Sequence, residues 1–147
     1  GIRWAGNQKF EYQQMRTFPF KGFYNAVNQE GVNLYSLQLS DSSSTDLSKY
    51  NITDLEEYLT DWEQTAGAIA NLDLVITSCT SVAHLSAAMG KETWVIVPTM
   101  PYYVWAVPGS KSSWYDSVNL IRQEEFGNWD KPFTKVKQEL EIRKWQK

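Results

Sequence analysis

The sequence contains very few of the residues that crosslink a fold or bind a structural metal. Of its 147 residues, one is a cysteine and one is a histidine. A single Cys cannot form an intramolecular disulfide, and one Cys with one His cannot supply a structural zinc site of the usual kind. Stability must therefore come from a hydrophobic core, and 42% hydrophobic residues suffice for a single domain spanning residues 1–147.

Excess positive charge and long apolar runs are also absent. The chain has 14 Lys and Arg against 17 Asp and Glu, so nothing indicates binding to a nucleic-acid backbone. No apolar run approaches the roughly 18 residues of a membrane span, and no signal-peptide pattern is present. We expect a cytoplasmic protein without a membrane span. Because Gly1 leads directly into an apolar stretch without an initiator Met, we also expect an N-terminal part to be missing.

Short apolar or β-branched runs alternate with helical patterns along the chain. Strands are predicted at 2–5, 32–39, 74–76, 93–97 and 118–121. Helices are predicted at 20–27, 62–72, 80–89 and 131–145, and polar loops at 6–19 and 40–54. This order predicts parallel βαβ units, and hence an α/β domain with a Rossmann-like open parallel sheet flanked by helices.

Charge is unevenly distributed along the sequence. Seven acids and one lysine lie between Leu39 and Glu63, whereas residues 1–22 carry four cations and one acid. The positive excess therefore lies around the first predicted strand and the loop after it, which contains Gly6, Asn7 and Arg16. In open parallel sheets, ligands bind just beyond the carboxyl ends of the strands, so this loop is a candidate for the site.

The segment after the strand at 74–76 is a second candidate. Thr80 and Ser81 lie where a strand gives way to a helix, and a helix N-terminus presents unpaired amides and a partial positive charge to an anion. Their hydroxyls can donate to a phosphate oxygen. Alternatively, Ser78, Thr80 or Ser81 simply caps the helix, which requires no ligand.

Cys79 and His84 flank this predicted helix start. His84 lies one turn into the helix, where it either donates to a phosphate or ribose oxygen or packs as a hydrogen-bonded core residue. Cys79 is either a nucleophile activated by the helix N-terminus or a small buried hydrophobe. The spacing of five residues directs the two side chains away from a common helical face, which argues against a Cys–His pair.

A third segment, 98–117, combines prolines with aromatic residues. Stiff aromatic loops can present rings to nucleobases or sugars, and we take Tyr103 and Trp105 as possible contacts of this kind. The alternative is that these rings cap the core. We expect this capping role for Trp114 and Tyr115, which immediately precede a predicted strand.

The segment from Asp73 to Lys91, DLVITSCTSVAHLSAAMGK, followed by TWVIVP up to Pro98, resembles the donor-binding half of GT-B glycosyltransferases. More narrowly, it is similar to bacterial glycosyltransferase domains that follow tetratricopeptide repeats. These are related to ADP-heptose heptosyltransferases and, more distantly, to O-linked N-acetylglucosamine transferase. The resemblance extends to further short motifs, namely Trp4-Ala5-Gly6-Asn7, Arg16-Thr17, Gln64-Thr65-Ala66, Ser113-Trp114-Tyr115 and Arg122-Gln123.

The resemblance implies one half of a GT-B fold, with a nucleoside-diphosphate sugar bound as substrate and no metal or other cofactor. Thr80, Ser81 and the amide of Val82 would hold the diphosphate, with His84 close by. Arg16 would neutralise the leaving diphosphate. Gly6 and Asn7 would let the first loop approach the donor. The catalytic base and the acceptor pocket would belong to the missing N-terminal acceptor domain, so the isolated domain is expected to be inactive.

One position departs from the family pattern. Cys79 stands where these enzymes commonly have Asp in the motif Asp-Thr-x-x-x-His, and that Asp contacts the donor sugar. The departure motivates an alternative, a degenerate domain that serves as a protein-interaction module through its aromatic loop and its acidic segment 41–63. A dehydrogenase is a weaker alternative, because no Gly-x-Gly-x-x-Gly follows the first strand.

Overall fold

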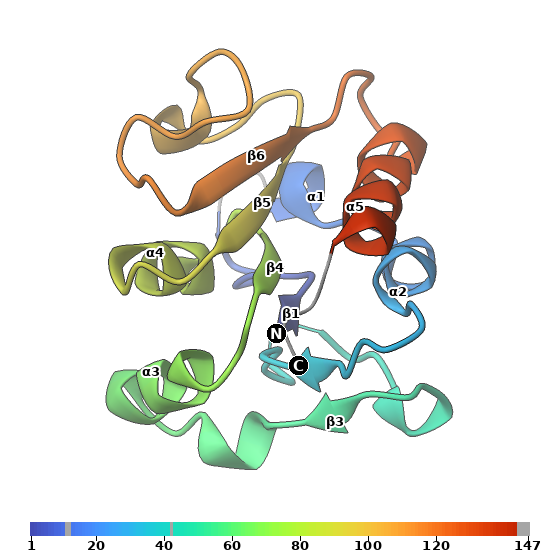
Figure 1. The fold of residues 1–147 in the computed structure, drawn as a ribbon, viewed down its shortest axis with the longest axis vertical. Helices are drawn as coiled ribbons and strands as arrows, with labels where there is room; N and C mark the ends of the chain where they lie inside the picture. The colour runs from blue at the N-terminus through green and yellow to red at the C-terminus, as the bar shows by residue number, and fades with distance from the viewer. Residues whose placement is uncertain (11–12, 42, 144–147) are drawn as a thin grey trace.

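The computed structural model describes residues 1–10, 13–41 and 43–143. Six strands form one open sheet in the order β3-β2-β1-β4-β5-β6, and all neighbouring strands are parallel (Figure 1). The strands are β1 Ile2–Arg3, β2 Tyr35–Ser36, β3 Thr53–Asp54, β4 Val75–Ser78, β5 Thr93–Val97 and β6 Val118–Arg122. The predicted α/β, Rossmann-like class is therefore confirmed.

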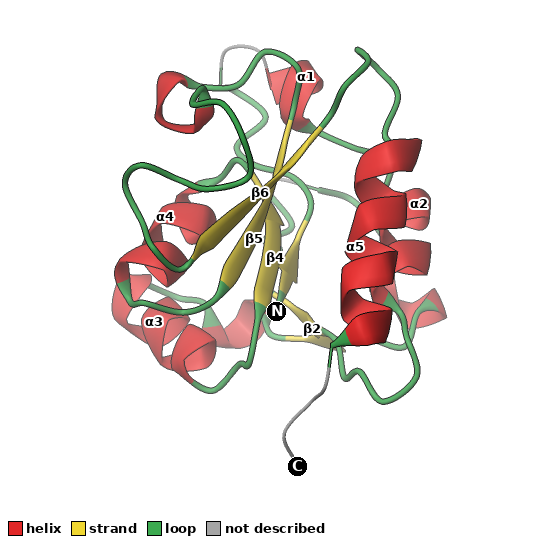
Figure 2. Ribbon diagram, turned by 45° about the horizontal axis from the view of Figure 1, so that its top comes forward, coloured by secondary structure: helices red, strands yellow, loops and turns green. Residues whose placement is uncertain are grey.

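Helices cover both faces of the sheet. The helices are α1 Gln13–Arg16, α2 Phe20–Val27, α3 Trp62–Ala70, α4 Ser81–Ala88 and α5 Asp130–Ile142. Helices α2 and α5 pack on one face and α3 and α4 on the other, with the short α1 near the carboxyl ends of the strands (Figures 1 and 2). None of the helices in the described ranges is long and apolar enough to cross a bilayer.

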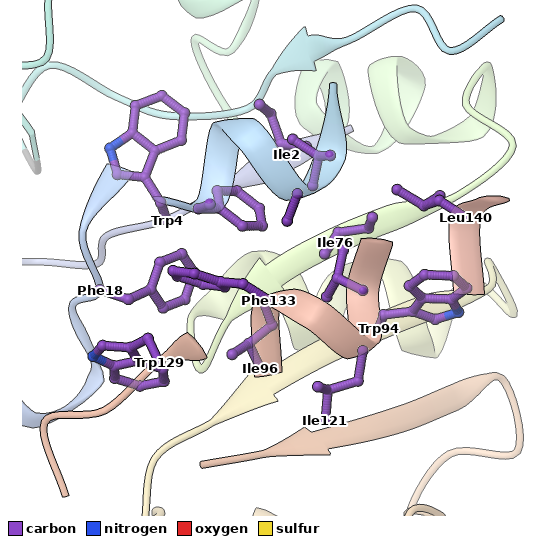
Figure 3. Packing of buried hydrophobic residues seen from close by; sticks show 14 of the residues in the cluster. Ile2, Trp4, Phe18, Ile76, Trp94, Ile96, Ile121, Trp129, Phe133 and Leu140 are labelled. Carbon is purple, nitrogen blue, oxygen red and sulfur yellow. The ribbon is translucent and has the colours of Figure 1, made fainter. Parts of the chain in front are cut away.

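The face under α2 and α5 holds the larger part of the core. Phe18 makes edge-on contacts with Phe133 and Trp129, at ring-centroid distances of 5.5 Å and 5.3 Å, above Ile96 (Figure 3). A side chain at Gly22 would come within 2.9 Å of the Phe133 ring, so glycine allows α2 and α5 to pack closely. The opposite face is filled by two smaller clusters under α3 and α4, which are mainly aliphatic but include Trp105.

The structure corrects several predicted boundaries. Strands β1 and β2 contain two residues each and are shorter than the predicted 2–5 and 32–39. The segment 40–54, predicted as a loop, contains the 3₁₀ turn η1 Leu47–Lys49 and the edge strand β3, and the loop 6–19 contains α1. The final helix ends at Ile142, and the last part of its predicted range, from residue 144 onward, lies outside the described residues.

Candidate functional site

A pocket of about 400 Å³ lies where the strand order reverses between β1 and β4. In sheets of this type, this reversal opens a crevice at the carboxyl ends of the strands, because the connections on either side run in opposite directions. The volume falls within the range of small-molecule sites. The lining includes many of the residues expected from the sequence: Gly6, Asn7, Arg16, Cys79, Thr80, Ser81, His84 and Trp105.

The N-terminus of α4 faces this pocket without a side-chain cap. Thr80 occupies the N-cap position, but its hydroxyl lies 3.2 Å from that of Thr77 and accepts no helix amide. In the part of the chain that the structure describes, neither Ser78 nor Ser81 caps the helix with its side chain. The capping interpretation of these hydroxyls is therefore wrong. Among the described residues, the amides of Ser81 and Val82 have no acceptor and are left to solvent or to a ligand, whereas that of Ala83 donates to the carbonyl of Thr80.

Arg16 brings a positive charge to the same place. Its Nη1 donates to the carbonyl of Cys79 at 2.7 Å, its Nε donates to Gln13 Oε1 at 2.6 Å, and its guanidinium lies 4.2 Å from the centroid of the Phe10 ring. Among the described residues, Arg16 forms no ion pair with a carboxylate. Burial lowers the pKa of Arg16, but a guanidinium stays protonated at neutral pH. A fixed cation thus lies beside the start of α4.

Gly6 makes this arrangement sterically possible. A Cβ atom at this position would lie 3.0 Å from Nη2 of Arg16 and 3.3 Å from Cγ2 of Thr80. The absence of a side chain therefore lets the first loop, the guanidinium and the helix start meet. The neighbouring Asn7 is exposed, and its side-chain oxygen accepts from the amide of Lys9 at 2.9 Å, which shapes the loop.

Arg3 also lines the pocket, although it is not among the site residues predicted from the sequence. Its Nε donates to the carbonyl of Ala5 at 3.3 Å and its Nη1 to that of Leu37 at 3.0 Å. Only 7% of the residue is exposed. The sequence signal that could have identified it is a charged residue inside the short apolar run 2–5. Charged side chains are almost never buried unless a partner binds them.

His84 combines the two roles that the sequence left open. It lines the pocket, its Nδ1 lies 3.1 Å from the hydroxyl of Tyr115, and its ring packs 4.8 Å from that of Trp105. Burial lowers the pKa of His84, so the imidazole is mainly neutral at neutral pH. The His84 side chain therefore packs against Trp105 and also lines the pocket.

The aromatic residues differ from expectation. Trp105 is 1% exposed and belongs to the core, as the alternative of a core-capping ring has it, and the residue also borders the pocket. Tyr103 is exposed but does not line the pocket, whereas its neighbour Tyr102 does. Tyr115 packs against the core as expected, but Trp114 is exposed and does not cap it.

Cys79 and Val82 are turned toward the interior. The Cys79 side chain belongs to the hydrophobic cluster under α4, with Sγ 3.6 Å from the carbonyl of Ile96. Burial raises the pKa of its thiol to about 12. A thiol of this kind is not a nucleophile at neutral pH, which removes the cysteine-nucleophile alternative. Val82 is buried and does not line the pocket, although its amide lies in the first turn of α4.

A second pocket and the distribution of metal-binding side chains also distinguish this site from the rest of the molecule. The second pocket, of about 370 Å³, lies at the amino ends of β1 and β4, where open α/β sheets do not usually bind their ligands. Within the described ranges, no group of three His, Cys, Asp or Glu side chains could hold a metal ion.

Comparisons with known proteins give no match. No protein-family model, no curated protein and no solved structure matches the chain. The function must therefore be inferred from the site itself and from the sequence motif that forms it.

Proposed function

We propose that this domain binds the diphosphate of a nucleotide sugar, as the donor-binding half of an inverting, metal-independent glycosyltransferase. One observation carries the proposal: the Arg16 guanidinium and the uncapped N-terminus of α4 meet in one pocket at the reversal of strand order. The motif around Thr80, which resembles that of GT-B enzymes, lies at this position. A cation and a helix N-terminus together favour a phosphate ligand.

The same groups suit the chemistry of glycosyl transfer. When the bond between the sugar and the diphosphate breaks, negative charge develops on the leaving phosphate oxygen. A guanidinium and free amides that already point at that oxygen stabilise the charge without reorganisation. The base that deprotonates the acceptor would come from the N-terminal acceptor domain, and none of the described residues is assigned that role.

Calorimetric titration with UDP, GDP, ADP and CDP tests the proposal, with NAD as the probe for a dehydrogenase. We expect one nucleoside diphosphate to bind and NAD not to bind. Arg16→Ala should weaken that binding by about 10-fold to 100-fold, the usual effect of losing a charge-assisted hydrogen bond, and Thr80→Ala should weaken it less. Lys9→Ala is the matched control, because it removes a cation from the same loop but outside the pocket.

If both site variants titrate like the unmodified chain, the site assignment is wrong. If the folded chain binds no nucleotide at all, a second function gains support, that of a protein-interaction module. The observation that favours it is a group of exposed side chains beside the pocket: Phe10, Met100, Tyr102 and Tyr103 are 47%, 65%, 54% and 66% exposed. Exposed apolar groups of this kind are typical of protein-binding surfaces.

A further inference from the structure

Arg3 lies between two cavities at the carboxyl edge of the sheet. One is the pocket beside α4, and the other, of about 410 Å³, is lined mainly by apolar groups that include Leu59, Trp62 and Val82. Arg3, Leu39 and Ser81 line both cavities. Arg3 is the one charged residue of these three, so a ligand that extends from the first cavity toward the second lies next to it.

The hydrogen bonds of Arg3 fix the guanidinium but do not use all of its donors. An arginine side chain has five N–H donors, and the carbonyls of Ala5 and Leu37 each take one. Within the described ranges, no other acceptor lies within hydrogen-bond distance of the remaining donors, and Arg3 forms no ion pair. The backbone thus holds this group in place and leaves donors available to a ligand.

The charges around the pocket favour an anion with more than one negative charge. Two guanidinium groups, those of Arg3 and Arg16, border the pocket, and among the described residues that line it Asp41 is the one acid. Burial lowers the pKa of Arg3, Asp41 raises it, and the like charge of Arg16 lowers it further. A nearby anion stabilises a cation that is withdrawn from water, so a ligand with two negative charges would stabilise the buried guanidinium of Arg3 and the half-buried one of Arg16.

We propose that Arg3 is a second ligand-binding cation of this site and makes it select a diphosphate over a monophosphate. The inference rests on the proposed function, since it divides the two phosphate groups of the proposed ligand between the two cations. Arg16 and the start of α4 bind one phosphate, and Arg3 binds the other. The competing explanation is purely structural, namely that Arg3 only ties the ends of β1 and β2 together.

The test is the ratio of two affinities measured for each variant of the full chain. Inorganic pyrophosphate and phosphate are titrated calorimetrically, as are UDP and UMP or the corresponding pair for whichever base binds. We expect the unmodified chain to bind the diphosphate at least about 10-fold more tightly than the monophosphate. Arg3→Met should bring this ratio close to one, because it removes a contact that only the second phosphate makes.

Two controls separate the outcomes. Arg16→Met should weaken both ligands and largely keep the ratio, and Lys9→Met should change neither affinity. A merely structural Arg3 would change the melting temperature and leave the ratio intact, which would overturn the inference while the proposed function stands. Failure of the unmodified chain to bind any diphosphate would overturn the proposed function itself.

A second measurement, an NMR titration, uses the unmodified chain and so does not depend on whether an Arg3 variant folds. The NMR signal of the Arg3 Nε–H group reports on its guanidinium, which a bound phosphate would shift. We expect pyrophosphate to shift this signal and inorganic phosphate to shift mainly that of Arg16. An Arg3 signal that is unchanged at saturating pyrophosphate would refute the assignment even if Arg3→Met fails to fold.

Discussion

The single thiol of the chain offers a direct test of how the segment before α4 is packed. Cys79 is 5% exposed, and burial raises the pKa of its thiol from 9.0 to about 12, although the charges of Arg16 and Arg122 act in the opposite direction. Alkylating reagents attack the thiolate, so the native chain should react much more slowly than the unfolded chain.

The expected retardation follows from the pKa. At pH 8, an increase of about three pKa units lowers the thiolate population roughly 1000-fold. A more basic thiolate is also more nucleophilic. With a Brønsted slope of about 0.45, the rate constant of the thiolate rises by a factor of roughly 20, which offsets part of this loss. The net effect is a reaction about 50-fold slower than that of the unfolded chain, before burial of the sulfur blocks the reagent further.

The assay is a time course with iodoacetamide, followed by intact mass, on the native chain and on the same chain in urea. Because the sequence contains one cysteine, each labelled molecule reports on Cys79 alone. Native and unfolded rates within about 5-fold of each other would refute the packing described above. They would also restore Cys79 as a candidate nucleophile.

Three further predictions concern the site, the core and a surface ion pair. Gly6→Ala should displace the adjacent guanidinium and weaken diphosphate binding about 3-fold to 10-fold in calorimetry, whereas Gly67→Ala, in open space on α3, should leave binding unchanged. Phe133→Ala should lower the free energy of unfolding by about 3–5 kcal/mol in urea titrations, and a loss below about 1 kcal/mol would contradict the packing under α5. Hydrogen bonds from Arg143 lower the pKa of Glu92, so this pair stabilises the fold above the ordinary glutamate range and loses its effect as pH falls through the lowered pKa. Both side chains are partly exposed, so Glu92→Gln should cost less than about 1 kcal/mol at pH 7 and nothing measurable near pH 2, as followed by thermal unfolding at each pH.

The helices and the apolar strands could be predicted from the sequence, whereas α1, η1 and β3, which lie in segments predicted as loops, could not. The runs that became β4, β5 and β6 are continuous and buried, and their apolar pattern identifies them without tertiary information. Strand β3 has no such pattern, because Thr53 and Asp54 are both exposed at the edge of the sheet. Its pairing with β2 depends on hydrogen bonds of the main chain, which side-chain patterning does not reveal.

The sequence predicts those site residues that follow the end of a strand. Gly6, Arg16 and Thr80 follow strand ends, and the rule that parallel strands place their carboxyl ends at one edge is enough to bring them together. Arg3 was missed because it lies within a strand, where the direction of a side chain depends on the register with β2 and β4. Composition alone also could not show that the Trp105 ring turns inward.

A cationic pocket in a chain of net charge −3 illustrates why overall charge is a poor guide to a site. Beyond about 8 Å at physiological ionic strength, exposed charges are largely screened. Most acids of segment 41–63 lie from β3 through η2 Glu56–Tyr58 to the start of α3, Asp46 caps η1, and among the acids of this segment only Asp41 lines the pocket. An anion in the pocket would therefore experience mainly the buried guanidinium of Arg3, the half-buried guanidinium of Arg16 and the helix amides, which water screens least. The reversal of strand order provides this local field by bringing the basic N-terminal segment next to α4.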